Sequence, residues 1–113
     1  MKAKSNRKST KSVFPVIKIG YDQKIIYSNL AGLPILQEWD CALNAKLPEY
    51  ILARYTALKN CFVNKATDEM LVPFRDFIIR FRVSASPVEG FIELAGYKID
   101  TAVPVKDYKF HLN

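Results

Sequence analysis

Side chains suited to catalysis or metal binding are few in this 113-residue sequence, and they stand far apart. The one histidine, His111, lies near the end of the chain, distant from both cysteines, Cys41 and Cys61. A nucleophile paired with histidine needs that histidine inside the fold, and a zinc ion takes about four ligands. The sequence therefore predicts no catalytic set and no metal site, and both cysteines are expected to be half-buried packing residues.

The acidic residues and the glycines show no catalytic arrangement either. Four acids fall at expected turns or helix ends, where a solvated cap is the usual role: Asp22, Glu38, Asp40 and Glu49. The four glycines form no G-x-x-x-x-G-K phosphate loop. Instead, Gly90 is typical of a turn and Gly96 of a close packing contact. We therefore expect a protein that is not an enzyme.

The formal charge of +6 is concentrated at the N-terminus. Residues 1–12 contain five basic residues and no acid: Lys2, Lys4, Arg7, Lys8 and Lys11. The remainder holds twelve basic and eleven acidic residues, so it is nearly neutral. We predict that residues 1–13 form a flexible basic tail, or else a cap that folds back, and that nucleic acid is not a partner.

Composition indicates one small globular domain, since 50% of the residues are hydrophobic and 25% are charged. No stretch approaches the roughly 18 consecutive apolar residues that cross a bilayer. Pro15 and Lys18 interrupt the apolar segment that would follow the basic start of a signal peptide. Two cysteines make no disulfide framework, so we expect a reducing, cytoplasmic location and no membrane span.

The chain opens with two expected strands, residues 14–22 and 24–29, that form a hairpin. Asn29 is suited to cap a short helix over residues 30–39, which its glycine and proline weaken. Together these features predict a hairpin that leads directly into an irregular helix.

A connector at 40–47 precedes a second expected helix, residues 48–60, with Pro48 in its first turn. Its apolar stripe comprises Ile51, Tyr55 and Leu58. Asn60 is a plausible stop, which leaves residues 61–68 as a loop.

The last third predicts three consecutive strands, at residues 69–74, 77–85 and 91–100, followed by a C-terminal extension at 101–113. The order of two strands, helices and three strands predicts an α+β domain over residues 14–100. We expect one five-stranded antiparallel sheet with the helices on one face. The first hairpin must then lie beside the last strand.

Two segments of this layout carry a recognisable pattern. Residues 15–31, PVIKIGYDQKIIYSNLA, contain an apolar strand, an acidic turn and the run I-x-Y-x-N-x-A before a helix. Residues 81–100, FRVSASPVEGFIELAGYKID, contain a proline turn and then G-[YF]-[IV]-x-L-x-G-x-x-I. In this order and separation they resemble the opening and closing hairpins of a PAS domain. The family's closing Asp-Ile-Thr is replaced here by Lys98-Ile99-Asp100, and the helical middle is short.

The resemblance implies a non-catalytic sensory and signal-transduction module. Such modules bind a small molecule between sheet and helices, or dimerise, and pass a signal to an effector. An effector such as a histidine kinase would be attached or partnered, since these 113 residues contain none. The alternatives are a plain interaction or structural α+β domain with a filled core, and a small-ligand carrier or cryptic enzyme of similar layout.

The side chains expected to line the cleft between sheet and helices are all apolar or aromatic: Ile51, Tyr55, Phe77, Ile79, Phe81, Val83, Ile92 and Leu94. They suit a small apolar ligand or a filled core. Haem lacks an axial histidine within the domain. The surroundings of Cys41, WDCALN, do not match the Asn-Cys-Arg motif of flavin photosensors. We therefore predict no cofactor.

The opposite face of the sheet is expected to carry a mixed apolar and charged patch: Ile78, Arg80, Phe91, Glu93 and Tyr97. In related domains this face is covered by a helix or by a second copy. An exposed patch of this kind often marks an interaction site. We predict a homodimer, or docking of a signalling effector, at this face.

Overall fold

The computed structural model describes residues 14–101, which form five strands with four helical segments between the second and third. The strands are β1 (Val16–Gly20), β2 (Ile25–Ser28), β3 (Asp68–Phe74), β4 (Phe77–Ser86) and β5 (Phe91–Thr101). The helical segments are η1 (Leu30–Gly32), α2 (Leu33–Glu38), α3 (Glu49–Arg54) and α4 (Thr56–Asn64). The predicted tail, 1–13, and nearly all of the extension, 101–113, lie outside the described residues. No helix within the described range is long and apolar enough to cross a bilayer.

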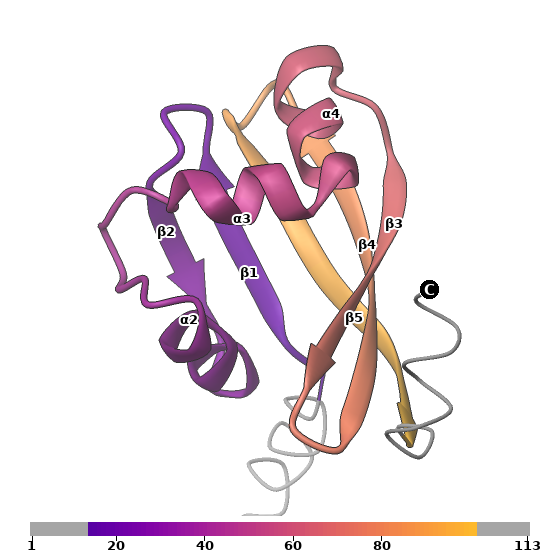
Figure 1. Cartoon of the computed structure of the whole chain (residues 1–113). Helices are drawn as coiled ribbons and strands as arrows, with labels where there is room; N and C mark the ends of the chain where they lie inside the picture. The colour runs from indigo at the N-terminus through magenta and orange to yellow at the C-terminus, as the bar shows by residue number, and fades with distance from the viewer. Residues whose placement is uncertain (1–13, 102–113) are drawn as a thin grey trace, which may run out of the picture.

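The five strands form one sheet in the order β2-β1-β5-β4-β3, and every neighbouring pair is antiparallel. The first hairpin joins the last strand through β1, where Ile17 faces Leu94 and Ile19 faces Ile92. This confirms the predicted α+β architecture and the predicted position of the hairpin. The helices lie on one face of the sheet, and nothing in residues 14–101 covers the other face (Figure 1).

The core lies between this sheet and the helices because apolar side chains alternate along the central strands. Ile17, Ile19, Phe81, Ile92 and Leu94 are completely buried on the helix side. Burying one such side chain contributes about 1.5–3 kcal/mol relative to leaving it exposed. The alternation in these strands therefore fixes which face of the sheet the helices cover.

The predicted single helix over residues 48–60 is wrong, because the structure divides it into α3 and α4. Tyr55 separates them with an extended backbone, at φ −113° and ψ 95°. Its ring is buried beside Trp39, with 5.9 Å between the ring centroids. The break allows Ile51 in α3 and Leu58 in α4 both to be completely buried, although the two segments differ in direction.

The predicted stop at Asn60 and the loop beginning at residue 61 are also wrong. Helix α4 continues through Asn64, and the left-handed Lys65, at φ 58°, ends it. The N–H of Lys65 donates to the carbonyl of Cys61. Cys61 itself is completely buried, so the continued helix keeps another side chain in the core.

A bulge in β5 changes which side chains face the helices. Phe81 pairs with Gly96, whereas Arg80 pairs with Lys98, so Tyr97 is an extra residue. Because of this extra residue, Ile99 pairs with Ile79 and lies on the helix side of the sheet. Without the bulge, strict alternation from Ile92 would place Ile99 on the opposite side.

Gly96 beside this bulge has the predicted close contact. Its N–H donates to the carbonyl of Pro15 at 2.8 Å. A Cβ on Gly96 would lie 2.9 Å from the Pro15 ring. Gly90, at φ 83°, occupies the turn between β4 and β5, as its position predicted.

The connector at 40–47 protects the outer edge of β2. The N–H of Ile25 donates to Ala45, and the carbonyl of Ile25 accepts from Asn44. Lys24 and Lys46 form an isolated antiparallel bridge beside these bonds. The connector thus pairs with the first residue of β2, the strand at one edge of the sheet, and β3 forms the other edge.

Candidate functional site: the open face of the sheet

The side chains predicted to line a ligand cleft lie mostly in the packed core. Ile51, Phe81, Val83, Ile92 and Leu94 are completely buried, and Ile79 and Tyr55 are nearly so. All seven belong to one cluster of buried apolar side chains. Phe77 differs, since 45% of its surface is exposed at the end of β4. A ligand bound among the buried residues would have to displace them, because the interior is close-packed.

Among the hollows of residues 14–101 are four that lie at the margins of this core. The largest, about 690 Å³, lies between α2 and the connector, and another of about 320 Å³ lies beside α3 and α4. A third, about 410 Å³, opens near Trp39, and the fourth, about 270 Å³, lies beside Phe77. None of the four is lined by Phe81, Val83, Ile92 or Leu94.

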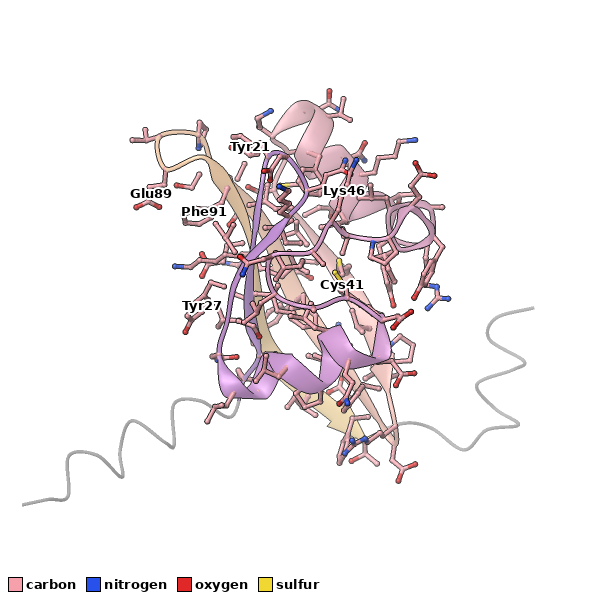
Figure 2. The ribbon with its side chains drawn as sticks, turned by 90° about the vertical axis from the view of Figure 1, so that its left-hand side faces the viewer. Tyr21, Tyr27, Cys41, Lys46, Glu89 and Phe91 are labelled. Atoms are coloured by element: carbon pink, nitrogen blue, oxygen red, sulfur yellow. The ribbon has the colours of Figure 1, made fainter. Side chains whose placement is uncertain are left out.

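The sheet surface opposite the helices, here called the open face, gathers side chains from all five strands. Its members are Lys18, Tyr27, Glu69, Leu71, Ile78, Arg80, Arg82, Phe91, Glu93, Ala95, Tyr97, Lys98 and Asp100. Tyr27 and Phe91 project from the sheet on the side away from Cys41 and Lys46, which lie on the helix side (Figure 2). The five residues predicted for the partner face, Ile78, Arg80, Phe91, Glu93 and Tyr97, all belong to it.

Cations on the open face lie against aromatic rings. The Lys18 ammonium is 5.2 Å from the Tyr27 ring centroid and 5.1 Å from that of Phe91. The Arg82 guanidinium is 5.8 Å from the Tyr97 ring. An exposed cation–π contact contributes about 0.5–1 kcal/mol. These contacts hold the rings and the cations of neighbouring strands together at the surface.

A polar network crosses the other end of the open face. Arg80 Nε donates to Asp100 Oδ2 at 2.8 Å, and Lys98 Nζ lies 3.9 Å from Asp100 Oδ1. The bond to Asp100 raises the pKa of Arg80 above its ordinary value. A hydrogen bond to Glu69 raises the pKa of Tyr97. The network therefore links β3, β4 and β5 with charges of both signs.

The open face extends further than the sequence prediction, which used only the last two strands. Lys18 and Tyr27 join it because Lys18 pairs with both Tyr27 and Glu93. The outward position of Lys18 follows from the alternation of its strand. The first hairpin was expected beside the last strand. The alternation of residues 14–22 would therefore have been enough to assign Lys18 to the open face.

The two cysteines were expected to be half-buried, and the structure buries them more deeply, with 7% of Cys41 and none of Cys61 exposed. Cys41 and Cys61 are both free and buried, and burial is the main cause that raises the pKa of each thiol. Cys41 Sγ lies 3.6 Å from the Lys46 carbonyl, so it contacts the connector backbone. Within residues 14–101, no three His, Cys, Asp or Glu side chains gather as a metal site.

Comparisons of the chain with protein-family models, curated proteins and solved structures found no match. The resemblance expected from the sequence was based on residues 15–31 and 81–100. In the fold these segments lie side by side, because β1 pairs with β5 along its whole length.

Proposed function

We propose that this chain is a non-catalytic, PAS-like signalling module that acts by protein–protein interaction, with a second copy of itself on the open face. The observation that carries the proposal is a sheet covered by helices on one side only within residues 14–101. Its other side carries the exposed rings of Tyr27 and Tyr97 and the half-buried ring of Phe91. Aromatic rings that gather at the surface of one face, here with charged side chains between them, are typical of an interaction surface.

The charges of the open face favour a second copy over a polyanion. Four basic side chains, Lys18, Arg80, Arg82 and Lys98, stand among three acidic ones, Glu69, Glu93 and Asp100. In a two-fold symmetric dimer, the same surface of the two copies is in contact. Basic side chains of one copy can then lie against acidic side chains of the other when the surface carries nearly equal numbers of both. A nucleic acid would instead need a clear excess of cations.

The size of the open face supports the same partner. The five strands have five, four, seven, ten and eleven residues. At about 3.3 Å per residue and about 4.8 Å between strands, the face measures about 590 Å². Standard interfaces begin at about 600 Å² on each partner, so the face is large enough for a small dimer interface when nearly all of it is covered.

The packed core favours this interaction role over a ligand between α3 and the sheet. The plain structural domain with a filled core remains the alternative function. The two differ in one respect: the proposed module needs a partner on its open face, whereas a structural domain leaves Phe91 in contact with water.

Sedimentation velocity of the full chain and two variants tests the proposal. Phe91→Glu places a carboxylate on the open face, where β5 begins beside the β4–β5 turn. Val63→Glu makes a similar change on α4, at a side chain with 66% of its surface exposed. We expect dimers for the wild type and for Val63→Glu, and monomers for Phe91→Glu. Circular dichroism checks that each variant is folded. A monomeric wild type across the micromolar range, or an equally dimeric Phe91→Glu, would refute the role of this face.

A further inference from the structure

We infer that the hollow beside Phe77, here called the end hollow, is a binding site for a small, uncharged apolar molecule. Its volume is about 270 Å³. Every lining residue is apolar: Pro15, Ala31, Ile35, Phe74, Phe77, Ile79 and Ile99. It lies on the helix side of the sheet and has no lining residue from α3 or α4. Of the eight residues predicted to line the cleft, only Phe77 and Ile79 line this hollow.

The end hollow lies where η1, α2, the β3–β4 turn and the end of β5 meet. Helix α2 has only six residues, and α2 and the β3–β4 turn lie at the same end of the sheet (Figure 1). The bulge at Tyr97 brings Ile99 to the helix side, where it faces Ile79. Ile35 and Ile79 are almost completely buried and belong to the hydrophobic core, so they form the floor of the hollow. Phe77 and Ile99 remain 45% and 38% exposed at its opening.

The lining determines the class of ligand. With no polar side chain among the seven, water in the hollow would find few hydrogen-bond partners, and an apolar molecule gains by displacing it. A buried charge without a partner is costly, which disfavours ions. A peptide brings backbone N–H and C=O groups that need partners, which disfavours a chain segment. The volume lies just below the roughly 300–1,000 Å³ of drug-sized sites, which indicates a ligand of one or two rings.

A ligand in the end hollow would touch the same strands that form the open face. Ile79 and Ile99 face the hollow, while their neighbours Arg80 and Asp100 form an ion pair on the opposite side. The inference adds a ligand to the proposed signalling module. A role of this ligand in signalling rests on the proposed function. Binding itself depends only on the hollow.

Toluene is a suitable probe, with benzoate as its charged counterpart of similar size. Titration of the isotope-labelled full chain, followed by NMR, should shift the methyl signals of Ile35, Ile79 and Ile99 in a saturable way. Benzoate should bind at least about tenfold more weakly because its charge finds no partner. Equal binding of both probes, or toluene shifts confined to Leu36 and Leu43 beside the largest hollow, would overturn the inference.

Two matched substitutions locate the site. Ala31→Leu adds atoms to the lining of the end hollow, whereas Ala53→Leu makes the same change at an exposed position in α3. Ala31→Leu should weaken toluene binding at least tenfold, and Ala53→Leu should leave it unchanged. Unchanged binding in Ala31→Leu contradicts the site. If Ala31→Leu does not fold, Ile99→Asn at the opening provides the same comparison, because an amide in the lining disfavours toluene.

The outcome is separable from that of the dimer experiment. If toluene fails to bind while Phe91→Glu abolishes the dimer, the ligand site is wrong and the interaction module stands. If toluene binds to a monomeric wild type, the site stands and the open-face dimer is wrong.

Discussion

Tyr97 connects three strands of the open face through one side chain. Its hydroxyl donates to the Glu69 carboxylate on β3, and its ring lies beside the Arg82 guanidinium on β4. Tyr97 is the extra residue of the β5 bulge, between the pairs Phe81–Gly96 and Arg80–Lys98, so it has no partner of its own in β4. Tyr97 is therefore the residue in which the bulge and the charge network meet.

The ionisation of Tyr97 tests this arrangement. The bond to Glu69 raises its pKa in the folded chain, so Glu69→Gln should lower that pKa toward the ordinary value. NMR of a labelled ring carbon of Tyr97, recorded against pH, measures this pKa in the wild type and in Glu69→Gln. Stability from this bond is present below the ordinary tyrosine pKa of about 10 and is lost as pH rises through the raised folded value. Identical titration of Tyr97 in the two proteins would contradict the contact.

At the scale of elements, Asn29 ties the beginning of β1 to the first helical turn. Its Oδ1 accepts from the N–H groups of Val16 and Gly32, each at 3.0 Å. Its Nδ2 donates to the Phe14 carbonyl at 2.9 Å. The residue thus completes the predicted helix cap and also fixes the chain where it enters the sheet.

Replacement of Asn29 should measure that connection. Asn29→Ala removes the side-chain partner of the Val16 N–H and of the Phe14 carbonyl, whereas the Gly32 N–H keeps its bond to the carbonyl of residue 29. We therefore expect the free energy of unfolding to fall by about 1–3 kcal/mol. Asn29→Asp keeps the acceptor oxygens and should lose less. Urea denaturation followed by circular dichroism gives both values. An Asn29→Ala chain as stable as the wild type would show that the cap contributes nothing.

The elements also show how far sequence reasoning reaches. Alternation of apolar residues correctly predicted five strands, and the N-cap preference of asparagine predicted the helix start at Asn29. The break at Tyr55 was missed because it depends on packing against Trp39, which is distant in sequence. The bulge was missed because one extra residue leaves the apolar pattern before Gly96 unchanged.

At the scale of the whole molecule, strand order and layer arrangement were predictable because the hairpin and the last strand each needed a neighbour. Whether the cleft is empty was not predictable. The same apolar side chains suit a cavity or a core, and the difference depends on how closely α3 and α4 approach the sheet. The end hollow likewise lies beside the β5 bulge, which residue types do not reveal, although the short helix on its other side was predicted from a glycine and a proline.

The central claim is that the open face meets its own copy. Isotope-filtered NOE spectra of a mixture of labelled and unlabelled full chains measure that contact directly. The predicted result is a set of intermolecular contacts between Phe91 of one copy and Tyr97 or Ile78 of the other. Intermolecular contacts confined to helix-side residues such as Val63, or none at millimolar concentration, would contradict it.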